Sequence, residues 1–268
     1  MPSVTIVSSN LLLDKELRKK FGGNLPSTAS EVKTVVQEAL TNPESHHWHR
    51  SNDGTHIKLD PKATFANGSG SLASEDVEVK VKFFPVSFEA NAAQTAIEAV
   101  FENIKPFHID SLQISVPIEA LDALSIGPQP KDKDADYEAC LNQFVELWQG
   151  LESHLDQKKV KKLGICDIET ATLEDLYGKV IRKPSSININ LQSCCVVPPE
   201  LVTFAKNNNI QVNTHSDPDV LLSNTDLAEM KNHDLNTLSL DWIIRYLILD
   251  QKRGVLKERR FIIGLKSE

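Results

Sequence analysis

The sequence predicts an α/β fold, a (β/α)8 barrel of the TIM type whose N-terminal part is irregular. Strand-like stretches recur at roughly 77–85, 111–116, 160–165, 185–191 and 210–215, with helical periodicity between them. The last two strands enclose a short helix that begins at a pair of prolines, which implies a right-handed crossover and a parallel sheet. Five consecutive β-α units leave two architectures, an open doubly wound sheet or a barrel. No G-x-G-x-x-G follows a strand and no Walker A sequence occurs, so the barrel is favoured.

A chain of 268 residues is long enough for one large α/β domain. We therefore expect residues 1–268 to form a single barrel domain. Within it, residues 43–74 are rich in turn formers and show no sustained period, so we expect an irregular surface excursion there. Residues 238–254, LSLDWIIRYLILDQKRG, are strongly apolar and end at Gly254, which predicts a helix closed by a C-terminal glycine.

Bulk composition excludes several classes of protein. The net charge of −8 argues against nucleic acid as a main ligand, because phosphate binding needs a basic surface. No apolar run has membrane-spanning length, and the N-terminus lacks the features of a signal peptide. The four cysteines show neither a C-x-x-C pair nor zinc spacing. We therefore expect a reduced, cytoplasmic compartment.

Lys82 lies on the polar face of the first strong strand, together with Glu78 and Lys80. In a barrel that face can point into the lumen, where a desolvated lysine could be catalytic. The alternative is an ordinary lysine that faces solvent.

Four histidines, His46, His47, His49 and His56, gather in the irregular stretch. Imidazoles at short spacing can bind metal, but no carboxylate or cysteine is placed to complete a rigid site. We expect a solvated loop there and no metal.

Cys194 and Cys195 follow directly after a strand, at the end where barrels carry their functional residues. An exposed thiol there could pair with another chain or sense redox state, whereas a buried pair would be inert. His215, at the end of the next strand, is the nearest base by topology. Three aspartates also lie near strand boundaries, where catalysis and helix capping explain them equally well: Asp110, Asp167 and Asp217.

Two segments resemble the aldo-keto reductase family, namely GICDIE (164–169) and WIIRYLILDQKRGV (242–255). The resemblance implies a (β/α)8 barrel that uses NADPH, with Lys82 at the lysine position of the family. The departures from the family pattern concern the acidic residue and the proton-donating tyrosine, which have no counterpart, and the phosphate-binding loop after the late helix. Ser115 stands at the family's histidine position, and His215 stands where the family has a ring-stacking tyrosine. Cys166 and Asp167 occupy the two nicotinamide-contacting positions.

One branch of that family shares these departures, the regulatory (modifier, or light) subunits of glutamate–cysteine ligase. The run QSCCVVPPEL, residues 192–201, is the most specific segment of this resemblance. It implies a non-catalytic partner that forms a heterodimer with the catalytic subunit, raises its affinity for glutamate and relieves feedback inhibition by glutathione. It also implies that no cofactor is required, with Lys82 as a vestigial cofactor residue.

In that branch the cysteine pair is suspected of forming a disulfide with the catalytic subunit, which makes Cys194 and Cys195 the candidates here. The surfaces that we expect to contact the partner are the polar loop at 126–136 and the loops near Cys194. An NADPH-binding reductase, or a retained nucleotide pocket that acts as a sensor, is the alternative. We expect the non-catalytic regulatory role. Carbonyl reduction needs a proton donor and a bound hydride donor, and Lys82 alone supplies neither.

Overall fold

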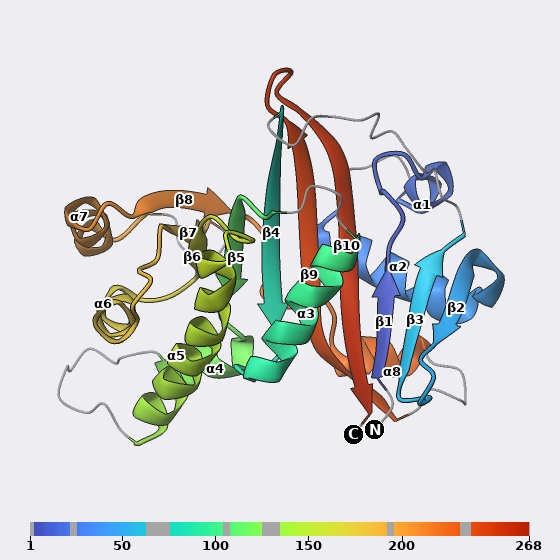
Figure 1. Ribbon diagram of the computed structural model, residues 1–268, viewed down its shortest axis with the longest axis horizontal. Helices are drawn as coiled ribbons and strands as arrows, with labels where there is room; N and C mark the ends of the chain where they lie inside the picture. Colours follow the sequence, from blue (N-terminus) through green and yellow to red (C-terminus); the bar gives the residue numbers. More distant parts are fainter. Residues whose placement is uncertain are drawn as a thin grey trace. The chain divides into compact units, whose positions relative to one another are not determined.

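A computed structural model describes most of the chain, which divides into two compact units (Figure 1). Unit 1 comprises Met1–Val79 and Asp217–Glu268, and unit 2 comprises Lys80–Ser216. The expectation of a single domain stays a prediction. Among the described helices, none is both long and apolar enough to cross a membrane. The described residues are 3–21, 26–62, 76–103, 108–124, 135–191, 196–230 and 237–267.

The strands of unit 2 follow the predicted alternation of strand and helix. They are parallel to one another and lie in the order β4-β5-β6-β7-β8. The bounds are β4 (Val77–Pro85), β5 (Ser111–Ser115), β6 (Leu163–Cys166), β7 (Ser186–Asn190) and β8 (Gln211–His215). The helices are α3 (Ala90–Asn103), α4 (Ile118–Leu124), α5 (Ala135–Asp156), α6 (Thr170–Lys179) and α7 (Pro199–Asn207). The five predicted strands are thus confirmed.

Helix α5 supplies the aromatic centre of unit 2. Its Phe144 ring stacks on Phe88 at a centroid distance of 4.5 Å and meets Trp148 edge-on. The buried Trp148 indole donates its only hydrogen bond to the Arg182 carbonyl at 2.7 Å. The helix is fixed because large apolar rings are buried while their one polar atom is satisfied.

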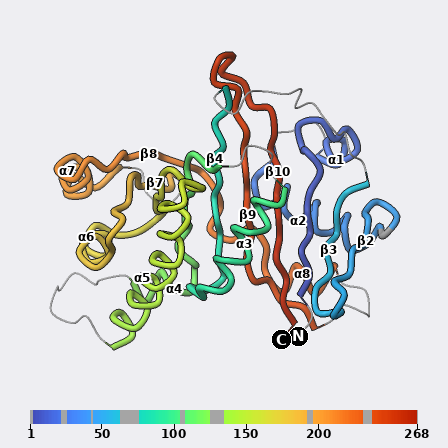
Figure 2. Tube along the Cα trace, in the orientation of Figure 1, coloured from blue at the N-terminus to red at the C-terminus, as the bar shows by residue number. Residues whose placement is uncertain are grey.

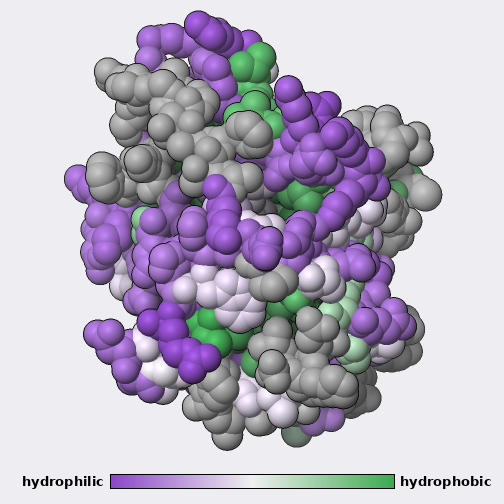
Figure 3. Space-filling view, turned by 90° about the vertical axis from the view of Figure 1, so that its right-hand side faces the viewer, coloured by the Kyte–Doolittle hydropathy of each residue, from purple (hydrophilic) through white to green (hydrophobic). Residues whose placement is uncertain are grey.

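Unit 1 is built on a mixed sheet with the strand order β2-β3-β1-β10-β9. Strands β1 and β3 are parallel, and the other neighbours are antiparallel. The strands are β1 (Ser3–Val7), β2 (His46–Arg50), β3 (His56–Pro61), β9 (Leu238–Asp250) and β10 (Val255–Ser267). The helices are α1 (Lys15–Lys20), α2 (Thr28–Thr41), the short 3-10 helix η1 (Pro43–Ser45) and α8 (Asn224–Met230). The surface on the side of α1 and β2 is mostly hydrophilic, with small hydrophobic areas between (Figure 3).

The prediction of a helix at 238–254 is wrong, because this stretch forms strand β9 and the turn into β10 (Figure 2). Trp242, Ile244 and Tyr246 are buried at alternate positions, and β-branched and aromatic residues favour a strand. Gly254 closes the hairpin turn with a φ of 64° rather than capping a helix. Gly264 on β10 lies so close to Trp242 that an added Cβ would be 2.2 Å from the indole Cε2.

The expected surface excursion at 43–74 is also corrected. Residues 43–61 form η1 and the β2–β3 hairpin, and residues 63–74 lie outside the described residues. The α/β class is confirmed, but the described strands do not close into a barrel. Antiparallel pairing of β9 with β10, and of β10 with β1, takes the place of further parallel β-α units in unit 1.

Candidate functional site

Three of the residues singled out in the sequence meet within unit 2. Lys82 comes from β4, Asp167 directly follows β6, and His215 ends β8. Because parallel strands end at the same edge of their sheet, the carboxyl ends of β6 and β8 bring Asp167 and His215 together. We call Lys82, Asp167 and His215 the strand-end cluster.

The strand-end cluster is a chain of hydrogen bonds. Lys82 Nζ lies 3.4 Å from His215 Nδ1, and His215 Nε2 lies 2.8 and 3.0 Å from the two oxygens of Asp167. A lysine ammonium only donates and a carboxylate only accepts. The neutral ring of His215 therefore accepts from Lys82 at Nδ1 and donates to Asp167 from Nε2. Both nitrogens of the imidazole are engaged.

The backbone around Asp167 fixes the position of its carboxylate. Its φ of 61° lies in the left-handed region, which aspartate tolerates better than most residues. Its amide donates to the Asn188 carbonyl at 3.0 Å, and its Oδ1 accepts from the Asn190 amide at 2.8 Å. The carboxylate is therefore held between β7 and His215.

Lys82 is only 5% exposed, whereas Lys80 on the same strand is exposed, and the role of Lys82 as a vestigial cofactor residue stays a prediction. Its ammonium lies 5.0 Å from the centroid of the Phe84 ring, which adds a cation–π contact. Polar side chains also meet between β5 and β7, where Gln113 Nε2 donates to Ser186 Oγ at 2.8 Å.

Gly164 on β6 lies beside that hydrogen bond and leaves room for it. A Cβ at Gly164 would be 2.4 Å from Gln113 Oε1 and 2.4 Å from Ser186 Oγ. The buried Oε1 atom of Gln113 has no hydrogen-bond partner among the described residues. Sequence reasoning missed this glutamine, although its place between the apolar Leu112 and Ile114 on β5 was a usable signal.

The strand-end cluster engages both ring nitrogens of His215 within the protein. A general acid needs a pKa near the working pH and a proton that is free to move. The N–H of His215 is committed to Asp167. Burial raises the pKa of Tyr137 and of Tyr246, and Tyr137 donates its hydroxyl to Asp175 at 2.5 Å. Neither tyrosine is suited to the role of the family's proton donor.

The resemblance to the reductase family assigns Cys166 and Asp167 to nicotinamide-contacting positions, and the chemistry of these side chains does not fit that ring. Cys166 is fully buried, and Asp167 presents a carboxylate in place of an amide side chain. A carboxylate cannot donate to a carboxamide oxygen, and the oxygens of Asp167 already accept from His215 and Asn190. No reaction step through NADPH follows from this arrangement.

The other aspartates that the sequence singles out make different contacts. Asp110 pairs with Lys161 at 2.7 Å. Asp217, in unit 1, accepts from Arg245 Nη2 at 3.0 Å and from Thr28 Oγ1 at 2.9 Å. Among the described cysteines, Cys140 and Cys166 are free. Cys194, Cys195 and most of the loop at 126–136 lie outside the described residues, and Ser115 ends β5.

The four clustered histidines lie on the β2–β3 hairpin rather than in a loop. His47 and His49 are exposed on one face of β2, with ring centroids 6.3 Å apart. His56 Nδ1 lies 2.8 Å from Ser3 Oγ, and His46 is buried. Within the described ranges, no group of three or more metal-ligating side chains occurs. The absence of a metal site stays a prediction.

Comparison with known proteins decides the family. The aldo/keto reductase family model matches residues 63–217. The chain belongs to the aldo/keto reductase family. Over 97% of its length it is 28% identical to the glutamate–cysteine ligase regulatory subunits of Mus musculus and Homo sapiens, and it covers 91% of each of those proteins. It is 24% identical to the NAD(P)H-dependent D-xylose reductase of Kluyveromyces lactis, over 55% of this chain and 47% of that protein.

Proposed function

We propose that this protein is a non-catalytic regulatory subunit of glutamate–cysteine ligase. It binds the catalytic subunit as a heterodimer in the cytoplasm, raises the affinity of that subunit for glutamate and relieves feedback inhibition by glutathione. The likeness to the mouse and human regulatory subunits, which extends over 97% of the chain, supports this role.

The observation that carries the proposal is the strand-end cluster. Lys82, His215 and Asp167 bond to one another where a reductase needs a proton donor and a cofactor contact. A chain with this arrangement acts through binding rather than through turnover. Its effect on the ligase is then an affinity difference between two states of the catalytic subunit.

Ligase kinetics test the proposal. The catalytic subunit is assayed across a range of glutamate concentrations, with and without this protein, and again with added glutathione. We expect a lower KM for glutamate and a higher inhibition constant for glutathione in the mixture. Unchanged kinetics would contradict the proposal.

An NADPH titration of this protein alone, and an assay with a carbonyl substrate, distinguish the regulatory role from the alternative of an NADPH-binding reductase or nucleotide sensor. Membership of a reductase family and the position of Lys82 on β4 favour that alternative. Tight NADPH binding without an effect on the ligase would favour the reductase or the nucleotide sensor.

Covalent attachment to the partner is a separate part of the proposal. Cys194 or Cys195 forms a disulfide with the catalytic subunit under oxidising conditions. The double variant Cys194→Ser, Cys195→Ser then loses the cross-linked band on a non-reducing gel, whereas Cys140→Ser keeps it. Equal cross-linking in the double variant would leave only non-covalent contacts.

A further inference from the structure

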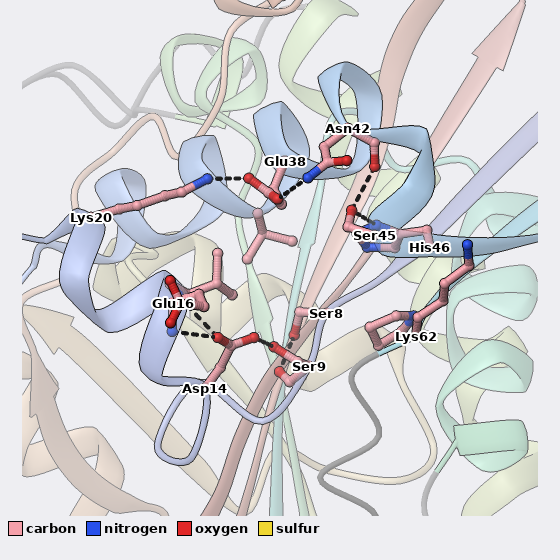
Figure 4. Close-up of a pocket in the computed structure, with 13 residues that line it drawn as sticks. Ser8, Ser9, Asp14, Glu16, Lys20, Glu38, Asn42, Ser45, His46 and Lys62 are labelled. Atoms are coloured by element: carbon pink, nitrogen blue, oxygen red, sulfur yellow. Dashed lines mark hydrogen bonds and ion pairs between the residues drawn. The ribbon is translucent and has the colours of Figure 1, made fainter.

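Unit 1 contains a cavity of about 440 Å³ between α1, α2 and the β2–β3 hairpin (Figure 4). This volume lies within the range of small-molecule sites in proteins. Leu17, Val35 and Pro61 supply apolar wall, and polar side chains surround them. The cavity lies in a different unit from the strand-end cluster and belongs to no site described so far.

The acidic groups of the wall are already satisfied by the protein. Asp14 accepts from the Ser9 hydroxyl at 2.5 Å and from the backbone amides of Glu16 and Leu17 at 3.0 Å. Glu38 accepts from Lys20 and, at 2.9 Å, from Asn42. These carboxylates fix the wall and are not open to a ligand anion.

His46 presents an unused acceptor. Ser45 Oγ lies 2.6 Å from the Asn42 carbonyl, which has no proton of its own, so the hydroxyl proton of Ser45 points there. Ser45 Oγ must then accept from His46 Nδ1, which is 2.7 Å away. Burial lowers the pKa of His46 and favours the neutral ring. The lone pair is therefore on Nε2, in a side chain that is only 6% exposed.

Lys62 is the unused cation beside that acceptor. Its backbone amide donates to the Ser45 carbonyl at 2.8 Å, which places the residue next to His46. Figure 4 shows Ser45, His46 and Lys62 on one side of the cavity, with Ser8, Ser9 and Asp14 opposite. Within the part of the chain that the structure describes, no carboxylate forms an ion pair with the Lys62 ammonium.

The charge of the wall restricts the ligand further. Three carboxylates, those of Asp14, Glu16 and Glu38, face two ammonium groups, those of Lys20 and Lys62. The excess of one negative charge disfavours a ligand that is only an anion. A ligand that suits both open groups carries a carboxylate for Lys62 and a charged N–H donor for His46 Nε2, together with an apolar body.

We propose that this cavity binds a zwitterionic α-amino acid with an apolar side chain. Its carboxylate pairs with Lys62, its ammonium donates to His46 Nε2, and its side chain packs against Leu17 and Val35. The inference does not rest on the proposed function, since it concerns unit 1 alone and its test uses the full chain without the ligase.

Ligand-observed NMR titration with L-leucine and two truncated analogues tests the ligand class. 4-Methylpentanoate keeps the carboxylate and lacks the ammonium, whereas 3-methylbutylamine keeps the ammonium and lacks the carboxylate. We expect leucine to bind saturably and each analogue to bind at least about tenfold more weakly, the loss typical of one hydrogen bond to a charged group. Equal binding of either analogue, or no saturable binding of leucine, would overturn the proposal.

Variants test the two residues that hold the ligand. Lys62→Met removes the carboxylate partner, and Lys58→Met is the matched control because Lys58 lies on the same hairpin and pairs with Asp60 rather than lining the cavity. His46→Gln retains an acceptor and His46→Phe does not. We expect binding to weaken at least about tenfold in Lys62→Met and His46→Phe, and to survive in Lys58→Met and His46→Gln. Leucine binding unchanged in a folded Lys62→Met chain would show that the assignment is wrong.

Discussion

Both units bring a histidine, a lysine and a carboxylate together, but they use these groups in opposite ways. In unit 2, Lys82, His215 and Asp167 bond to one another in a chain. In unit 1, the carboxylates around the cavity are held by neighbouring hydroxyl, amide and ammonium groups, while His46 and Lys62 remain open. Residue types alone therefore do not identify a ligand site, because what matters is which groups are left over once the internal bonds are made.

The difference has a consequence for stability. Removing one member of an internally bonded pair destabilises the fold, because the desolvation of the buried group that remains is no longer compensated. A group that faces a cavity without a partner can be removed at little cost to folding. We therefore expect substitutions of internally bonded residues to lower the free energy of unfolding. Substitutions of His46 or Lys62 should mainly weaken ligand binding.

The largest effect is expected at the buried ion pair of unit 1. Asp217→Ala removes the buried carboxylate that pairs with the partly buried Arg245, and we expect a loss of about 3 kcal/mol in the free energy of unfolding. Urea denaturation measures it. Lys161→Ala, which breaks the more exposed pair with Asp110, is the control and should cost at most about 1 kcal/mol. Similar losses in the two variants would remove the distinction between buried and exposed pairs.

A smaller loss is expected in the strand-end cluster. Asp167→Asn keeps a residue that tolerates the positive φ but removes the charge that accepts from His215. We expect the free energy of unfolding to fall by about 1–2 kcal/mol, because a hydrogen bond to a charged group is replaced by a neutral one. If Asp167→Asn had the same free energy of unfolding as the unsubstituted protein, the hydrogen bond between His215 and Asp167 would not stabilise the fold.

Two buried histidines extend the comparison to pH. The ring of His154 in unit 2 has no hydrogen-bond partner among the described residues, whereas His46 in unit 1 bonds to Ser45. Burial lowers the pKa of His154, and Lys159 lowers it further, against the opposing charge of Glu98.

Because the folded chain resists protonation of His154, the unfolded chain binds more protons below its own pKa of 6.5. Stability from this group is therefore lost as the pH falls through that value. His154→Leu should flatten the dependence of the urea midpoint on pH between about pH 7.5 and pH 5.5. An equally steep dependence in His154→Leu would assign the pH effect to other groups.

The smallest effect on stability is expected at Lys62, which faces the cavity of unit 1. Lys62→Met removes an exposed ammonium that has no ion-pair partner in the described ranges, so the free energy of unfolding should change by no more than about 0.5 kcal/mol. Thermal unfolding without ligand measures it. A larger loss would show that Lys62 is bonded within the protein and is not available to a ligand.

Local sequence patterns were sufficient for the β-α units of unit 2, where β4 and β5 alternate between more and less buried positions. They failed at residues 242–249, where every side chain except that of Arg245 is apolar and the period cannot be seen. The long pairing of β9 with β10 decides the structure of that stretch. Such a choice depends on a partner strand, which the local pattern does not contain.

The candidate sites depend even more on contacts between distant residues. Strand ends predicted the edge where Asp167 and His215 lie, and the polar face of β4 raised the possibility of an interior Lys82. The direction of each hydrogen bond could not be predicted, because it requires the distances between side chains from three strands. The cavity of unit 1 could not be predicted either, since residues 43–61 show no sustained period and form a hairpin only by pairing with one another and with β1.

The central claim is that the chain regulates a ligase by binding and has no catalytic role of its own. The most direct test measures the KM for glutamate of the catalytic subunit in three states: alone, with this protein, and with its Lys82→Met variant, whose folding is checked by circular dichroism. We predict that the protein lowers the KM and that the variant lowers it equally. No lowering by the unchanged protein, or a lowering that depends on Lys82 together with NADPH, would contradict the claim.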